Sequence, residues 1–150
     1  MATRFNKAGK KRICVIDGQG GGIGGAIIKQ LKELYNETVE IIALGTNAIA
    51  TAQMLKAKAN CGASGENAIV QTVGKVDVII GPIGIIMAHA MMGEVTLKIA
   101  EAVASSPAIK FIIPLSRDNI KIIGAPSIPL PHLIEELIEN HLKNFLANQL

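Results

Sequence analysis

The sequence is poor in aromatic side chains, which make up 3% of its 150 residues and include no tryptophan. Hydrophobic residues nevertheless reach 49%, so the core must be built from aliphatic side chains. This composition is typical of α/β proteins, in which parallel strands are buried on both faces. The length suits one domain with a sizeable core.

The sequence also lacks membrane and secretory signals. No apolar run approaches the ~20 residues that a membrane-spanning helix needs. Residues Met1–Phe5 contain no apolar stretch of the kind found in a secretory signal. Two cysteines, Cys14 and Cys61, are too few for a disulfide framework. We therefore expect a cytoplasmic protein with no membrane partner.

Positive charge is concentrated at the start of the chain. Five of the 15 basic residues lie in the first twelve positions, which contain no acid. We expect residues 1–12 to be a basic, flexible tail and residues 13–150 to form one Rossmann-like nucleotide-binding domain. A basic tail can bind nucleic acid. This one has a single aromatic residue, Phe5, and a helix-breaking Gly9, so nucleic acid is not an expected partner.

A glycine-rich stretch, Asp17–Gly25, separates an apolar run from a helical pattern. The run Ile13–Ile16 predicts a buried strand, and apolar residues then recur at the helical positions Ile23, Ile27, Leu31 and Leu34. Glycines at a strand-to-helix turn allow several backbone N–H groups to approach one ligand. The positive end of the helix dipole stabilises an anion there, usually a phosphate. Alternatively, the glycines only form a tight turn and allow close helix–strand packing.

The glycine spacing fits two dinucleotide motifs. The pattern G-x-G-x-x-G is met by Gly20, Gly22 and Gly25. A second spacing, which resembles that of short-chain dehydrogenases, is met by Gly18, Gly22 and Gly24. That resemblance covers only the first strand and helix, because Tyr35 is followed four residues later by Val39 and not by the family's lysine. A P-loop is excluded, since Ala26 and Ile27 replace its Lys and Ser/Thr.

The rest of the chain predicts an alternating α/β pattern. Further strands are expected at 39–44, 76–80, 109–113 and 120–123, and helices at about 47–59, 64–73, 84–105 and near the C-terminus, with a glycine-containing loop at 62–67. The connection between the last two strands is too short for a parallel crossover, which predicts an antiparallel hairpin. The expected fold is a Rossmann-like open three-layer sandwich: four parallel strands, one antiparallel edge strand and helices on both faces. For the four parallel strands, the orders 3-2-1-4 and 2-1-3-4 both remain open.

Either strand order places the loops after the first three strands on one rim of the sheet, where ligands bind in such folds. We expect a nucleotide or dinucleotide resembling NAD(P), or another small phosphorylated ligand, to bind there. The candidate binding residues are Asp17, Gly18, Gln19, Gly20, Gly21, Gly22, Ile23, Gly24, Gly45, Thr46, Asn47, Gly81, Pro82, Ile83 and Gly84.

The chemistry at this rim departs from a standard NAD site. The acid that holds the ribose should end the second strand, but Thr46 and Asn47 stand there. Asp17 suits a ribose hydroxyl, a metal ion or a substrate proton, or else bonds its own turn. Glu66 can reach the same rim, and His89 suits either a core or interface position or catalysis. No nucleophile–base pair and no metal-ligand spacing is present.

The predicted helix 84–105 carries Glu94 and Lys98 on its polar face, where they form a favourable i,i+4 pair. Met87 and Met91 lie on that same face. Exposed methionines at helical spacing indicate a subunit contact or an adaptable pocket wall, unless neighbouring loops cover them. A homo-oligomer is therefore expected.

Four strings along the chain are distinctive: I-D-G-Q-G-G-G-I-G (16–24), A-L-G-T-N-A (43–48), G-A-S-G-E-N-A-I (62–69) and I-I-G-P-I-G-I (79–85). With them the chain resembles a family of small, stand-alone bacterial domains of unknown function. The resemblance supports the fold and the rim but names no reaction. Three hypotheses remain: an oxidoreductase with a site shared between subunits, a non-catalytic binding or sensor module, and an assembly protein whose glycines are structural.

Overall fold

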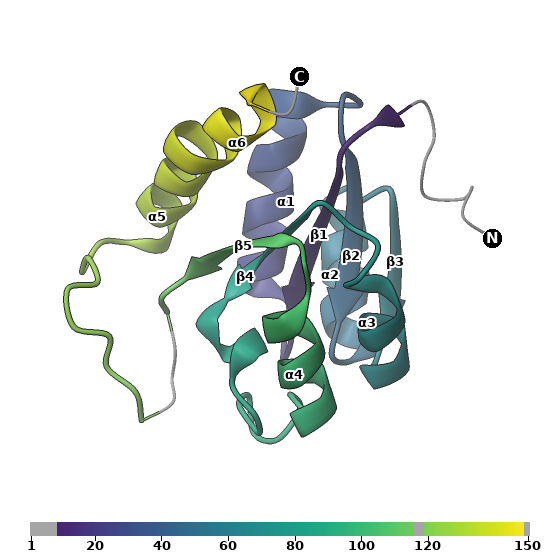
Figure 1. Cartoon of the computed structure of the whole chain (residues 1–150), viewed down its shortest axis with the longest axis vertical. Helices are drawn as coiled ribbons and strands as arrows, with labels where there is room; N and C mark the ends of the chain where they lie inside the picture. Colours follow the sequence, from purple (N-terminus) through teal and green to yellow (C-terminus); the bar gives the residue numbers. More distant parts are fainter. Residues whose placement is uncertain (1–8, 116–118, 149–150) are drawn as a thin grey trace.

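The computed structural model describes residues 9–115 and 119–148, which form a five-stranded sheet with helices on both faces (Figure 1). Every neighbouring pair of strands is parallel, in the order β3-β2-β1-β4-β5. The strands are β1 (Arg12–Asp17), β2 (Glu40–Gly45), β3 (Cys61–Ser64), β4 (Val78–Pro82) and β5 (Ile109–Ile113).

Helices connect the strands and follow the last one. They are α1 (Gly22–Tyr35), α2 (Ala48–Lys56), α3 (Glu66–Thr72), α4 (Leu97–Ser105), α5 (Leu130–Glu136) and α6 (Lys143–Ala147). A π-helical segment, Leu137–Leu142, joins α5 to α6, and a short 3-10 helix, Ile83–Ile86, follows β4. Among the described residues, no helix is both long and apolar enough to cross a bilayer.

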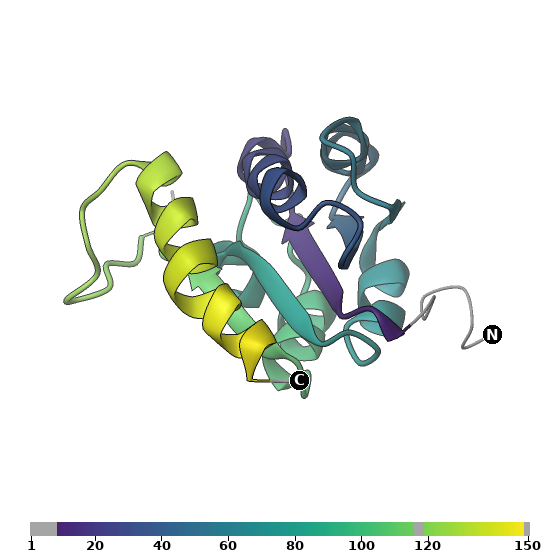
Figure 2. The ribbon, with the colours of Figure 1, turned by 90° about the horizontal axis from the view of Figure 1, so that it is seen from above.

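The core has two halves, one on each face of the sheet. Alternate residues of β1, such as Val15 and Ile16, point into opposite halves. One half contains α1, α2 and the C-terminal helix, whose inward-facing residues Leu133, Ile134, Leu137, Ile138 and Leu142 are buried. The other half contains α3 and α4, and Figure 2 shows the resulting layers from above. The predicted three-layer α/β arrangement is therefore confirmed.

The predicted antiparallel edge strand is wrong. The segment 120–123 forms no strand, and β5 pairs with β4 in parallel. The isoleucines of this segment are exposed, Ile123 to 94%, so no sheet face buries them. Part of the predicted hairpin turn, 116–118, lies outside the described residues.

The strand β3 replaces the predicted loop at 62–67. Its residues Gly62, Ala63 and Ser64 are small and exposed, so no apolar run announces an edge strand. The four strands that the sequence predicts follow the order 2-1-3-4. Once β3 is counted, the whole sheet reads 3-2-1-4-5, which is the order of the doubly wound dinucleotide-binding sheet.

The predicted long helix 84–105 is also wrong, because only its last part, α4, is α-helical. Between the 3-10 helix and α4, the φ angles of His89, Met91 and Met92 are 68°, 58° and 57°. Left-handed residues cannot continue a right-handed helix. The helix α4 starts anew at Thr96, whose side chain accepts a hydrogen bond from the Ile99 N–H at 3.2 Å. The segment 87–95 is therefore a folded loop that reaches the rim of the sheet.

Candidate functional site

Asp17 ends β1 and fixes the shape of the glycine-rich turn. Its buried carboxylate accepts hydrogen bonds from the backbone N–H of Gly18 at 2.8 Å and of Gly24 at 2.7 Å. The Gly21 N–H closes the turn on the Gly18 carbonyl at 3.0 Å. Burial raises the pKa of Asp17 above its ordinary value, although the N–H groups of Gly24 and Gly18 partly offset this. The structure thus shows the turn-aspartate alternative.

The fold itself requires some glycines of this turn. A Cβ on Gly24 would lie 2.6 Å from the Met54 sulfur and 3.0 Å from the Asp17 Cβ. Gly21 has a left-handed φ of 73°, and a Cβ there would lie 2.8 Å from the Ala50 carbonyl oxygen. These contacts leave no room for a side chain and explain both residues without a ligand.

At two positions of the turn, the fold does not require glycine. A Cβ on Gly20 or Gly22 would meet no atom within 4 Å, and neither residue has a left-handed φ. Within the described part of the chain, no acceptor is recorded for the N–H of either residue. Gly22 is the first residue of α1, whose N-cap residue is Gly21 and therefore supplies no side-chain cap. Asp17 accepts the Gly24 N–H in the first turn, and the N–H of Gly22 is left at the positive end of the helix dipole, a position that favours an anion.

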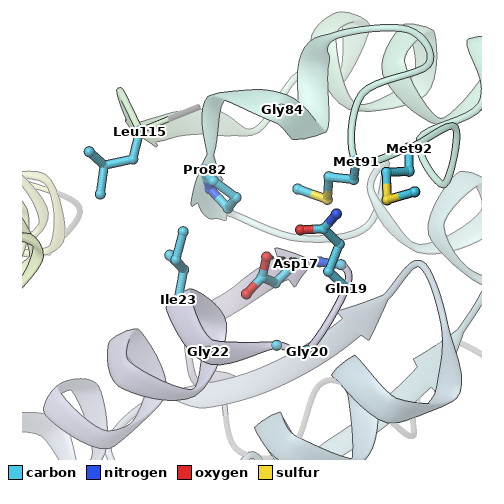
Figure 3. A pocket seen from close by; sticks show the side chains of 12 residues that line it. Asp17, Gln19, Gly20, Gly22, Ile23, Pro82, Gly84, Met91, Met92 and Leu115 are labelled. Atoms are coloured by element: carbon cyan, nitrogen blue, oxygen red, sulfur yellow. Dashed lines mark hydrogen bonds between the residues drawn. The ribbon is translucent and has the colours of Figure 1, made fainter. Parts of the chain in front are cut away.

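These two glycines face a cleft of about 570 Å³ at the carboxyl rim of the sheet (Figure 3). The turn from Asp17 to Ile23 forms one wall. Pro82, Gly84 and the methionines of the segment 87–95 stand opposite, and Leu115 lies at one end. Its volume lies in the range of small-molecule sites. The cleft is lined by Asp17, Gly18, Gln19, Gly20, Gly21, Gly22, Ile23, Pro82, Gly84, Met91, Met92 and Leu115.

Glu94 joins the loops that follow β1 and β2. Its Oε1 accepts three hydrogen bonds: from the Gln19 N–H at 2.9 Å, the Thr46 hydroxyl at 2.7 Å and the Asn47 side-chain amide at 2.7 Å. Burial alone would raise the pKa of Glu94, but the hydrogen bonds from Thr46, Gln19 and Asn47 outweigh it and lower the pKa. The sequence predicted Glu94 on a helix face beside Lys98 and gave no sign that it links the loops after β1 and β2.

The remaining predicted site residues lie beside the cleft and do not line it. Thr46 and Asn47 turn toward Glu94, and Asn47 also caps α2 by accepting the Ala50 N–H at 2.8 Å. Structural reasons explain Gly45, whose Cβ would strike the Thr51 hydroxyl, and Gly81, whose Cβ would strike the Ile16 carbonyl. Gly24 lies buried in α1, and Ile83 is also absent from the lining.

Two further candidates lie elsewhere. His89 is exposed, which excludes a core position; an interface position and a catalytic role both stay predictions. Glu66 accepts a hydrogen bond from the Thr96 hydroxyl at 2.6 Å and does not line the cleft. Met91 forms part of the cleft wall, which agrees with the adaptable-wall alternative.

The described lining of the cleft carries few reactive groups. Asp17 is the one ionisable side chain among the described residues that line it, and these include no Ser, Cys, His, Lys or Arg. The described residues also contain no cluster of three or more His, Cys, Asp or Glu that could hold a metal ion. General acid–base or nucleophilic catalysis needs side chains such as His, Ser, Cys or Lys within hydrogen-bond reach of the reacting group.

Comparisons with known proteins place the chain in a family. A search of curated proteins found no match. A solved universal stress protein in complex with cAMP resembles the chain at 17% identity and a TM-score of 0.40, over 69% of this chain and 98% of that chain. The family model described as a domain of unknown function, DUF3842, matches residues 12–146. The chain therefore belongs to the DUF3842 family.

Proposed function

We propose that the protein binds a nucleotide or another phosphorylated ligand in the cleft beside α1. In this proposal the phosphate oxygens accept hydrogen bonds from the backbone N–H groups of Gly20 and Gly22. One observation carries this proposal: both residues are glycine, line the cleft and offer unpaired N–H groups, although the fold would tolerate a side chain at either position. A ligand that approaches the backbone closely accounts for glycine at such positions.

The position in the fold supports the same ligand class. The sheet order changes direction beside β1, and in parallel sheets ligands bind outside the carboxyl ends of strands at this switch point. The positive end of the α1 dipole stabilises a negative group there by about 0.3–1 kcal/mol. Asp17 accepts hydrogen bonds from the N–H groups of Gly18 and Gly24. The N–H groups of Gly20 and Gly22 therefore remain available to a ligand.

Binding without catalysis fits the site better than an NAD(P)-dependent oxidoreductase does. The end of β2 carries Thr46 and Asn47 in place of the acid that holds the ribose of NAD. No lysine or arginine adjoins them to hold a 2′-phosphate. The described residues of the lining include no acid–base pair. A sensor or carrier of a phosphorylated metabolite is therefore the favoured form of the proposal.

Thermal unfolding tests the proposal. The protein is melted with AMP, ADP, ATP, NAD, NADP, FAD, coenzyme A, S-adenosylmethionine and sugar phosphates, with and without Mg²⁺. A ligand at 100 times its Kd stabilises the fold by about 2.7 kcal/mol. We expect at least one phosphorylated compound to raise the melting temperature, and Gly22→Val to remove that shift.

Gly74 supplies the matched control for this experiment. It is an exposed glycine distant from the cleft, and a Cβ there would also meet no atom within 4 Å. Gly74→Val should keep the ligand-induced shift. A ligand that stabilises Gly22→Val as much as the wild type would argue that the glycine turn is not its site. No shift with any compound would contradict the proposal.

Self-association is a second candidate function, and exposed apolar side chains favour it. Ile120, Ile122, Ile123 and Ile128 lie 36% to 94% exposed on the segment 119–129 before α5, which projects from the body of the domain (Figures 1 and 2). Apolar side chains gathered in this way often mark protein contacts. Sedimentation velocity should show an oligomer that Ile123→Asp dissociates. Ile49→Asp, at a residue 72% exposed on α2, is the control, and a wild-type monomer would refute the idea.

A further inference from the structure

We infer that Glu94 and Met91 close the β2 side of the cleft, so that it selects a compact ligand with one phosphate and excludes a dinucleotide. This inference rests on the proposed function and specifies its ligand. It assigns Glu94 and Met91 as specificity-determining residues.

The hydrogen bonds of Glu94 occupy the place where a dinucleotide would extend. In a doubly wound sheet, a dinucleotide lies across the switch point, and groups at the end of the second strand hold its ribose hydroxyls. Here Thr46 and Asn47 end that strand, and both donate to Glu94 Oε1 at 2.7 Å. The third donor, the Gln19 N–H, belongs to the glycine turn itself. The chain's own carboxylate thus stands where the second half of a dinucleotide would bind.

Close packing over Gly18 closes the same side sterically. A Cβ on Gly18 would lie 2.5 Å from the Met91 sulfur, 2.5 Å from the Thr46 hydroxyl and 3.2 Å from Glu94 Oε1. Not even a methyl group fits between the turn and the segment 87–95 at this point. Around Gly20 and Gly22, two and four residues further along, the space is open. The volume open to a ligand therefore lies beside Gly20 and Gly22, between the turn and the facing residues Pro82, Met91, Met92 and Leu115, and it is narrowest at Gly18 (Figure 3).

The charge of the site limits the number of phosphates. Asp17 contributes a carboxyl group to the lining, and the carboxylate of Glu94 accepts a hydrogen bond from the N–H of Gln19, which also lines the cleft. Among the described residues, no cationic side chain lines the cleft. Each additional phosphate charge would meet these acids, and no cation among the described lining residues offsets them; such repulsion is strong where solvent is partly excluded. A single phosphate group can be held by two backbone N–H groups and the helix dipole. Mononucleotides and sugar monophosphates fit this description.

Calorimetric titration with AMP, ADP and NAD tests the inference on the full chain. The proteins are the wild type, Glu94→Ala, Glu94→Gln and Glu101→Ala. The wild type should bind AMP at least tenfold more tightly than NAD or ADP. Glu94→Ala should narrow the AMP-to-NAD ratio at least threefold, because it opens the β2 side. Glu94→Gln should narrow that ratio less than Glu94→Ala does, since its amide oxygen can still accept hydrogen bonds from the same donors and only the charge is lost. Glu101 is an exposed acid on α4, and its replacement should change nothing.

Three results would overturn the inference. NAD binding the wild type as tightly as AMP would do so while leaving the proposed function intact, and so would an unchanged ratio in Glu94→Ala. Absence of binding by all three nucleotides, together with every sugar phosphate, would overturn both. Hydrogen exchange gives a readout without any ligand, because Glu94→Ala should speed exchange of the Gln19 amide at least tenfold. An unchanged exchange rate would show that Glu94 does not hold the turn.

Discussion

Two alanine substitutions in the glycine turn should change stability in opposite directions. Gly22→Ala adds a methyl group where no atom lies within 4 Å and where φ is not left-handed. Such a change stabilises a protein by about 0.4–1 kcal/mol, because it reduces the conformational freedom of the unfolded chain. Gly24→Ala adds the same methyl group 2.6 Å from the sulfur of the fully buried Met54 and 3.0 Å from the Asp17 Cβ.

The cost at Gly24 follows from these contacts. Overpacking of this kind costs about 1–3 kcal/mol. Helix propensity returns up to about 1 kcal/mol, so a net loss of roughly 1–2 kcal/mol is expected. Asp17 cannot easily move aside, because hydrogen bonds to Gly18 and Gly24 hold its carboxylate. The two variants should therefore differ by about 2–3 kcal/mol, or roughly 4–12 °C in melting temperature for a domain of this size.

Urea unfolding at neutral pH, with thermal melts in parallel, measures this difference. An equal loss of stability in both variants would mean that Gly22 has a structural role that the geometry does not show. A neutral Gly24→Ala would mean that α1 does not pack against Met54 as described. Either result would refute the distinction between glycines required by the fold and glycines left open for a ligand.

Three further predictions concern the groups around the turn. Asp17→Asn should cost about 1.5–3 kcal/mol of folding stability at neutral pH. The two carboxylate oxygens of Asp17 accept one N–H each, whereas the amide of Asn has one oxygen and would turn its NH2 group toward the other N–H. The raised pKa of Asp17 makes its contribution to stability fall as pH rises from 3.8 through the folded-state pKa, and urea unfolding across this range should show that decline in the wild type and not in Asp17→Asn. Glu94 should show the opposite sign. Its lowered pKa means that its contribution is present above 4.5 and is lost as pH falls through the folded-state pKa, so Glu94→Ala should be less sensitive to acid than the wild type in the same titration. Asn47→Ala removes the N-cap of α2 and should cost about 1 kcal/mol in chemical unfolding, whereas equal stability would show that the cap contributes nothing.

Local sequence patterns predicted much of the fold because they record local physical constraints. The apolar runs of β1, β2 and β4 are buried, that of β5 is partly exposed at the edge of the sheet, and each ends near a glycine or proline. Asn47 stands directly before α2 and caps it with its side chain, a role that Asn commonly has at this position. The glycine turn was placed correctly between β1 and α1. These features depend on residues that are neighbours in the chain.

Features that depend on distant contacts were not predictable in this way. Glu94 lies 75 residues from Gln19, and only the folded sheet brings the two together. The left-handed residues around Met91 include no signal except Gly93, because His89, Met91 and Met92 seldom adopt such angles. The helical periodicity therefore continued through a segment that is not helical. Similarly, β3 is an edge strand of small exposed residues, and its register with β2 defines it better than its composition does.

The hydrogen bonds of Asp17 and Glu94 have a consequence for the thermodynamics of binding. The stretch Asp17–Gly25, with six glycines, loses more conformational entropy on becoming ordered than any other stretch of similar length in the chain. Here that loss occurs during folding, since the N–H groups of Gly18, Gln19 and Gly24 are already held by carboxylates. A ligand arriving at Gly20 and Gly22 meets a preorganised surface, and little of its binding free energy is diverted to ordering the backbone. Even a small phosphate ester with few contacts can then be retained at a useful affinity.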